Sequence, residues 1–450
     1  MIALQTILVF IALYRVGEIL QRPRKLISPV SIVSFGFLFV YVISYYFLPT
    51  ETRSLYLSIP GYRIILLLAV LSSLAFIGGC RVARVCPRRF HASQHQNNER
   101  RVLNHSIILS LVAMTLWFWF IILSGGFLHY YESPHKHGGA WLTVSAYVYN
   151  WKYFIFPCAF VLLASFLLKR NRSLDAFFLF ATIAYLVVDA YWSGARGAVL
   201  RLLVVVAVPM LYLPIKRKIS KKVAVPLAIF AMGTVLVLPY IRAHTTLNAS
   251  GDELHAAIAV LRSGKVLEGS ASGRGNELVV AAATVISAAR TNTFGYGLPW
   301  LGPLINFVPR RFWPEKHNLA IFVNYPKMIR NGVGWQLAPG AAFTGLAGTY
   351  VEFWWFAPLA WGVFGWWGGR LEERAVTAPD WINAGYLSAY LIGLIYFVTQ
   401  GFGAAFTGWF YFFIAIWAVN RTTRLKTVSR PYPQGRPNPA TRRRRSAGEE

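Results

Sequence analysis

Cysteines and acidic residues are the scarce classes in this chain of 450 residues. It holds 3 cysteines and 17 aspartates and glutamates, against 45 lysines and arginines. The spacing of Cys80, Cys86 and Cys158 matches no disulfide framework and no metal motif, so we expect neither. The chain also lacks the segments of about ten residues with alternating hydrophobicity that mark the strands of membrane barrels. These absences exclude a disulfide-stapled scaffold and a membrane β-barrel.

Apolar residues dominate what is present, at 56% of the chain. A soluble domain of this size has no means of burying so much apolar surface, and runs of about 18 or more apolar residues match the ~30 Å hydrocarbon core of a bilayer. Because lipid leaves no backbone group unpaired, the spans should be helices. The sequence therefore predicts an all-α polytopic integral membrane protein with about 11 transmembrane helices. The predicted spans are 2–20, 29–48, 62–80, 106–123, 143–167, 175–193, 197–214, 223–241, 345–369, 383–402 and 404–420.

The basic residues alternate between the two sides of these spans. Short loops rich in Lys and Arg face the cytoplasm, and the N-terminus is outside if that rule holds here. The short outer loops 49–61 and 124–142 are then nearly free of basic residues. We therefore attribute the net charge of +28 to membrane topology and expect no nucleic-acid partner. The basic inner segments are 21–28, 81–105, 168–174, 215–222, 370–382 and 421–450.

Four regions follow from this topology. Residues 1–241 hold the first eight spans, residues 242–344 form one large extracytoplasmic loop, and residues 345–420 hold the last three spans. The tail, 421–450, is rich in proline and arginine, which predicts a disordered cytoplasmic segment. Its four consecutive arginines suit the anionic lipid of the inner leaflet. We expect a multi-pass membrane protein with its N-terminus outside and its C-terminus in the cytoplasm.

The loop 242–344 is too long to be a simple connector, and loops of this length are usually functional. Within it, residues 275–290 read as an apolar helix with Glu277 in its first turn and Arg290 in its last, as the helix dipole favours. We expect this helix to lie against the membrane or to pack into the mouth of the bundle. A packing helix or lid without chemistry is the alternative interpretation.

The stretch "FVPRRFWPEKHN", residues 307–318, is the most concentrated charged segment of this loop. Its prolines restrict the backbone, and its aromatic rings suit a membrane–water interface. Arginine forks match phosphate oxygens. Arg310, Arg311 and Lys316 would therefore hold a lipid-linked phosphate. The alternative is that these cations and rings only anchor the segment at the interface.

A second basic motif, "DAYWSGARGAVLR" at 189–201, lies at the predicted outer start of a span. Arg196 and Arg201 fall within the first turns of that membrane helix. Ionisable side chains in such positions are costly, and they indicate a functional site by default. A structural ion pair between Asp189 and one of these arginines is the alternative.

These two motifs resemble those of bacterial O-antigen and oligosaccharide repeat-unit polymerases of the Wzy type. "SGARGAVL" is similar to the Ser-x-Arg-Gly turn of that family, and "VPRRFWPEKHN" is similar to its Pro-Arg-x-x-Trp-Pro-x-Lys stretch, with His317 where the family often has proline. The order of spans, Arg-Gly turn, large outer loop and closing spans also fits. The resemblance covers about residues 180–420.

The resemblance implies a protein of the bacterial inner membrane that carries out a periplasmic glycosyl transfer without nucleotide sugar. The donor would be a glycan on undecaprenyl diphosphate and the acceptor a second lipid-linked repeat unit, for O-antigen, capsule or exopolysaccharide synthesis. The chain has no nucleotide-binding glycine-rich loop and no Asp-x-Asp motif, which is compatible, and we expect no metal and no cofactor. Membrane lipid is a further partner, and a flippase and a chain-length regulator are candidate protein partners.

Catalysis of this kind needs cations for the leaving diphosphate and a general base for the acceptor hydroxyl. The cations that would bind the diphosphate and the residues that would act as general base all have predicted outer positions. The sequence does not rank the candidates for the general base. The diphosphate-binding candidates are Arg196, Arg201, Arg242, Arg290, Arg310, Arg311 and Lys316. The candidate bases are Glu277, Glu315, His317, Glu352 and His244.

Two other readings stay open at this point. One is a related enzyme, either an O-antigen ligase or another glycosyltransferase that uses a polyprenyl-linked sugar. The other is a transporter of the lipid-linked oligosaccharide. Transporters tend to show internal repeats and broken helices near the membrane midplane. The sequence shows no convincing repeat, and its charges gather at the outer rim.

Overall fold

The structure is a computed structural model, and within its described residues every regular element is helical. Five helices are long and apolar enough to cross a membrane, which indicates a multi-pass membrane protein. Large apolar side chains such as Phe10, Leu13, Leu74 and Ile122 point outward from these helices, as lipid-facing residues do. The described residues are 1–85, 99–123, 154–167, 177–186, 196–213, 276–302, 323–337 and 343–423, with positions 126, 305, 308, 312, 313 and 315.

The chain begins with a helical hairpin. Helix α1 (Ile2–Gln21) leads through the 3-10 helix η1 (Pro23–Ile27) into α2 (Pro29–Phe37). Ser28 is the N-cap of α2 and accepts a hydrogen bond from the Ser31 amide, while Pro29 takes the first helical position, where a missing N–H costs nothing. The helix then continues through a π-helical turn, η2 (Leu38–Ile43), and α3 (Ser44–Phe47).

Helix α5 (Ile59–Val85) is the centre of the N-terminal half, and it packs in parallel along α19 (Ala357–Thr377). Glycines allow the two backbones to touch. A Cβ at Gly79 would overlap the carbonyl oxygen of Gly362, and one at Gly365 would overlap that of Phe76. Small residues permit this close approach where lipid supplies no hydrophobic force between helices. We call this contact the α5–α19 seam.

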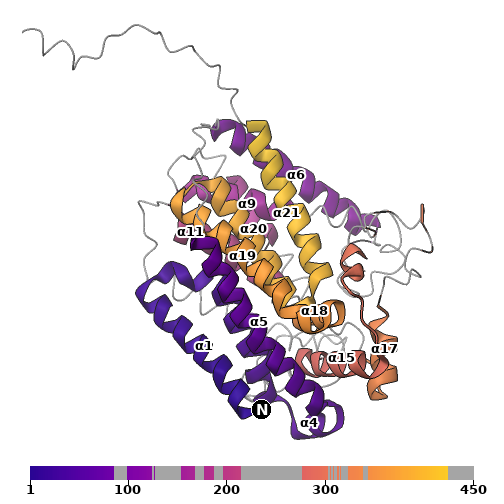
Figure 1. The fold of residues 1–450 in the computed structure, drawn as a ribbon. Helices are drawn as coiled ribbons and strands as arrows, with labels where there is room; N and C mark the ends of the chain where they lie inside the picture. Colours follow the sequence, from indigo (N-terminus) through magenta and orange to yellow (C-terminus); the bar gives the residue numbers. More distant parts are fainter. Residues whose placement is uncertain are drawn as a thin grey trace, which may run out of the picture.

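The remaining long helices surround the seam, as Figure 1 shows. Helix α20 (Trp381–Gln400) and helix α21 (Phe402–Thr423) form an antiparallel pair, in which the ring of Trp409 stacks on that of Tyr390. Helices α9 (Ile155–Leu167) and α11 (Arg196–Tyr212) pack against α20, and α6 (Glu99–Leu123) packs against α9 and α21.

Four short helices gather at the end of the bundle where the N-terminus lies (Figure 1). They are α4 (Thr50–Tyr56), α15 (Glu277–Thr291), α17 (Tyr325–Val333) and α18 (Gly345–Phe353). The predicted orientation assigns the N-terminus and the segments 49–61 and 242–344 to one face of the membrane. We call this end of the bundle the outer end, following that prediction, and the opposite end the inner end.

The structure differs from the prediction for the ninth span, which was expected as one helix over 345–369. It is two helices, α18 and α19, separated by a 3-10 turn at Trp354–Phe356. The apolar run is continuous across this turn, so hydropathy alone gives no sign of the break. The five apolar helices confirm the predicted spans 2–20, 29–48, 62–80, 106–123 and 383–402 in type and position, and the predicted span 223–241 lies outside the described residues.

Candidate functional site

Helix α15 confirms the helix predicted over 275–290 and packs inside the bundle. Asn276 caps its N-terminus by accepting hydrogen bonds from the amides of Leu278 and Val279. Every residue from 278 to 288 is buried, against α5, α17 and α18. An apolar surface all round is the pattern of a helix enclosed by protein. The outer end therefore has a rigid protein core.

Glu352 lies in the last turn of α18 and is only 5% exposed. Thr344 caps the start of this helix, and Gly345 lies so close to the Phe397 carbonyl of α20 that a Cβ there would overlap it. The helix is thus seated directly on the backbone of α20. Burial of a carboxylate is costly unless it is paired or hydrogen-bonded.

Only one hydrogen bond reaches the Glu352 carboxylate within the described part of the chain. The Tyr325 hydroxyl, from the first turn of α17, donates to Oε1 at 3.3 Å. The other oxygen, Oε2, is buried without a hydrogen-bond partner among those residues. Burial, followed by the charge of Glu352, raises the pKa of Tyr325 well above its ordinary value. Tyr325 is therefore a permanent donor.

The loop that follows α15 fixes the backbone around Glu352. The amide of Gly295 donates to the carbonyl of Val351 at 2.9 Å, and that of Gly297 donates to the carbonyl of Glu352 at 2.8 Å. Carbonyls in the last turn of a helix have no partner within the helix. The loop supplies these partners and so fixes the end of α18.

Two bulky residues beside Glu352 adopt a left-handed backbone that non-glycine residues rarely take. Trp354 has φ 52° and Tyr296 has φ 49°. Each such residue costs on the order of 1–3 kcal/mol and persists only where the surroundings impose it. Both rings contact the ring of Phe294, with centroid distances of 6.1 and 6.3 Å. Strain of this kind tends to gather at functional sites.

Exposed aromatic side chains lie beside this end of α18, and others occur in the predicted phosphate-binding stretch 307–318. Tyr296 is 74% exposed and Trp354 is 45% exposed. In the predicted phosphate-binding stretch 307–318, the described Phe312 and Trp313 are exposed as well. Amphipathic rings of this kind settle at a membrane–water interface. We therefore place Glu352 just below the surface at the predicted outer interface.

Arg201 is the predicted arginine that the structure describes most fully. It is 4% exposed on α11, and its guanidinium carbon lies 4.9 Å from the ring centroid of Phe156 on α9 and 5.0 Å from that of Tyr396 on α20. Contacts of a cation with two ring faces stabilise it in a desolvated setting. Tyr396 precedes Phe397, on which α18 is seated. Arg201 and Glu352 thus come from helices that share the outer half of α20.

Two other predicted residues, Glu277 and Arg290, are not part of the site around Glu352. Glu277 is half-buried at the start of α15, at the opposite end of that helix from the loop that contacts Glu352. Arg290 is exposed near the end of α15, and its Nη1 donates to the carbonyl of Gly332 at 2.9 Å. That contact joins α15 to α17, which gives Arg290 a structural role.

The remaining predicted residues are described in part or not at all. Glu315 is exposed. Arg196 begins α11, but its side chain lies outside the described part. Arg242, His244, Arg310, Arg311, Lys316 and His317 also lie outside the described residues.

Tyr325 was not predicted as a functional residue. The local signal around it, "NYPK", marks a helix start, because Asn324 caps α17 and Pro326 sits in its first turn. Nothing in that motif indicates that the ring faces Glu352, which follows 27 residues later. The sequence indicates where α17 begins, but the contact between Tyr325 and Glu352 depends on tertiary packing.

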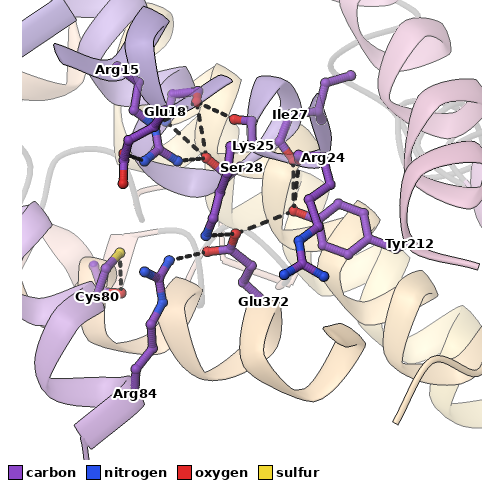
Figure 2. A network of polar contacts seen from close by, with 12 residues as sticks. Arg15, Glu18, Arg24, Lys25, Ile27, Ser28, Cys80, Arg84, Tyr212 and Glu372 are labelled. Atoms are coloured by element: carbon purple, nitrogen blue, oxygen red, sulfur yellow. Dashed lines mark hydrogen bonds and ion pairs between the residues drawn. The ribbon is translucent and has the colours of Figure 1, made fainter. Parts of the chain in front are cut away.

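A second polar cluster, also unpredicted, lies at the inner end and is drawn in Figure 2. Glu372 on α19 is 2% exposed; its Oε1 accepts from Lys25 Nζ at 2.7 Å and its Oε2 from Arg84 Nη2 at 2.8 Å. Tyr212 donates to Oε1 at 3.4 Å. Burial lowers the pKa of Lys25, and the charge of Glu372 offsets part of that effect. We call these four residues the inner ionic cluster.

Arg15 extends the polar contacts beside the inner ionic cluster. It is 3% exposed in α1, and its guanidinium donates to the hydroxyl oxygens of Ser28 and Ser31 and pairs with Glu18 (Figure 2). Arg15, Lys25 and Arg84 each pair with a carboxylate. This pattern is typical of a structural network that ties the N-terminal hairpin to α5 and α19.

The chain matches no protein-family model, no curated protein and no solved structure. The residues and their geometry are therefore the basis for assigning a function.

Proposed function

We propose that this protein is a membrane glycosyltransferase that polymerises undecaprenyl-diphosphate-linked oligosaccharide repeat units at the outer face of the bacterial inner membrane. The observation that carries the proposal is the buried Glu352, whose Oε2 has no hydrogen-bond partner among the described residues. A desolvated carboxylate with one free oxygen suits a general base for a sugar hydroxyl. The motif resemblance at 189–201 and 307–318 supplies the substrate class.

The proposed reaction is a single glycosyl transfer. The acceptor hydroxyl gives its proton to Glu352 while its oxygen forms a bond to the anomeric carbon of the donor. The bond between that carbon and the diphosphate oxygen breaks, and its electron pair leaves with undecaprenyl diphosphate. Fixed arginines stabilise the charge that develops on the leaving group. Arg201 is the described candidate for that role, and Arg196, Arg242, Arg310, Arg311 and Lys316 are further candidates from the sequence.

The position of the helix break supports an enzyme over a transporter. Transporters place broken helices near the midplane, around the transported ligand. Here the break lies at the outer end of α19, a helix of 21 residues that is about 31 Å long. Glu352 thus belongs to the rim of the bundle, where a lipid-linked substrate presents its glycan.

The test is a deletion strain whose surface and lipid-linked glycans are separated on a gel. We expect the polymer ladder to collapse to single repeat units, and plasmid-borne wild-type protein to restore it. Glu352→Gln should fail to restore it, while Glu51→Gln, which alters an exposed glutamate on α4 at the same end of the bundle, should succeed. Immunoblots of isolated membranes are the control that both variants are inserted in equal amounts.

Other outcomes identify the competing functions. Full-length lipid-linked polymer that is no longer moved onto the lipid A core would indicate a ligase. Repeat units that accumulate on the cytoplasmic side would indicate a transporter. An unchanged ladder in the deletion strain would contradict the proposed function.

A further inference from the structure

The hydrogen bond between α17 and α18 distinguishes the two oxygens of the Glu352 carboxylate. We propose that Tyr325 is the positioning residue of this site: it holds Oε1, so that Oε2 is the atom that receives the acceptor proton. The inference rests on the proposed function and adds to it the atom that acts as base and the residue that orients it. Tyr325 itself exchanges no proton in the step.

The chemistry of the two groups sets their roles. A tyrosine hydroxyl has one proton to donate, and an ionised carboxylate accepts at both oxygens. At 3.3 Å the hydroxyl occupies Oε1 and leaves Oε2 unpartnered within the described chain. Because burial and the neighbouring carboxylate keep Tyr325 protonated, it cannot compete with Glu352 as a base. A donor to the charged form also favours that form.

Tyr325 is held rigidly enough to orient its partner. Asn324 caps α17 by accepting a hydrogen bond from the Lys327 amide at 3.1 Å. The Tyr325 ring packs on Phe343, with ring centroids 4.5 Å apart. At the far end of α17, a Cβ at Gly332 would overlap Ser287 of α15. Since α15 is buried in the bundle, the hydroxyl of Tyr325 is positioned by the protein core.

The experiment uses the full-length protein in lipid nanodiscs, with the lipid-linked repeat units that accumulate in the deletion strain as substrate. Wild type, Tyr325→Phe, Glu352→Gln and Tyr390→Phe are compared over a range of pH. Tyr390 is the matched control, because it is a buried tyrosine whose hydroxyl donates to a backbone carbonyl, that of Phe364 at 2.7 Å, and not to a carboxylate. Melting temperatures are measured for every variant.

For Tyr325→Phe we expect kcat to fall on the order of 10- to 100-fold, as slight misplacement of a reacting group does, with KM within about twofold of wild type. The acidic limb of its pH–rate profile should move to higher pH by about one unit, because the carboxylate loses the donor that favours its charged form. Tyr390→Phe should keep the wild-type profile even where it melts at a lower temperature. If Tyr325 had a merely structural role, the acidic limb of the pH–rate profile would stay at its wild-type position.

If Tyr325→Phe fails to fold, 3-fluorotyrosine at position 325 replaces it as the test. Its more acidic hydroxyl is a stronger donor, so the acidic limb should move to lower pH. A wild-type profile for the altered protein, with Glu352→Gln inactive, would overturn the positioning role and leave the proposed function standing. Wild-type protein that makes no polymer from these units would instead overturn the proposed function.

Discussion

Two buried glutamates, one at each end of the bundle, differ in how completely the protein neutralises them. Glu372 accepts hydrogen bonds from Lys25, Arg84 and Tyr212, so both of its oxygens are occupied. Glu352 is buried almost as deeply but accepts only from Tyr325 among the described residues. A carboxylate enclosed by cations holds helices together, whereas one with an unpartnered oxygen is the general base in the proposed function.

This difference separates stability from activity at two residues of the same type. Removing one partner of a buried ion pair leaves an uncompensated charge, which is strongly destabilising. Removing a general base leaves the fold intact and slows the chemical step. Glutamine replaces either glutamate without a change of shape, so the two variants form a matched pair.

The largest expected effect is on the activity of Glu352→Gln. We expect kcat to fall on the order of 10²- to 10⁴-fold, the usual contribution of a general base, with a melting temperature close to that of wild type. The amide oxygen still accepts from Tyr325 in this variant. Polymer formation by the purified protein and its thermal unfolding in detergent are the two measurements. A melting temperature lowered as far as that of Glu372→Gln would remove the distinction between the two sites.

The reverse result is expected for Glu372→Gln. Lys25 and Arg84 would lose their shared anion, at a cost of about 3–5 kcal/mol in the free energy of unfolding. Protein that still folds should keep its activity per molecule. Glu51→Gln, at an exposed glutamate on α4, is the control for an ordinary charge removal. Equal melting temperatures for Glu51→Gln and Glu372→Gln would show that the inner ionic cluster contributes little to stability.

A smaller loss is expected for Lys25→Met, about 1–2 kcal/mol. Glu372 keeps Arg84 and Tyr212 as partners in this variant, and the methionine stays apolar where Lys25 is 8% exposed. Thermal unfolding of the single variants and of the Lys25→Met, Glu372→Gln double variant gives the coupling between the two residues. Additive effects would mean that their 2.7 Å contact carries no interaction energy.

The smallest expected effect is a gain in stability from Tyr296→Gly. Glycine adopts positive φ without the steric cost that a tyrosine meets, and the Tyr296 side chain is 74% exposed, so little packing is lost. We expect about 1 kcal/mol of stabilisation. Asn292→Gly is the control, because Asn292 has the same φ of 49° but asparagine tolerates it. A larger gain for Asn292→Gly would contradict strain at Tyr296.

The long helices were predictable because hydropathy and length decide them locally. Helices α1, α5 and α20 were predicted within a few residues of their bounds. The break at Trp354 was not predicted, since "YVEFWWFAP" is apolar on both sides of it. What ends α18 there is a left-handed backbone conformation and two hydrogen bonds from the loop after α15. Neither the backbone conformation nor these hydrogen bonds produce a recognisable pattern in the local sequence.

The candidate site was predictable only in its parts. Glu352 and Arg201 were both named, because ionisable residues in apolar surroundings are conspicuous. Their partners Tyr325 and Tyr396 were not, since a tyrosine in an aromatic-rich chain carries no signal of its own. The inner ionic cluster was missed for a related reason: its basic members had already been explained by the positive-inside pattern, and Glu372 lies 347 residues from Lys25.

The α5–α19 seam has a consequence for the order in which the chain is made. Helix α5 presents Gly79 to a partner that the ribosome completes almost 300 residues later. Glu372 follows Arg84 by 288 residues and Lys25 by 347. Until then the early helices carry two unmatched cations and an open groove of small residues. A protein truncated before residue 357 would keep both defects, and we expect membrane proteases to remove it faster than one truncated after residue 423.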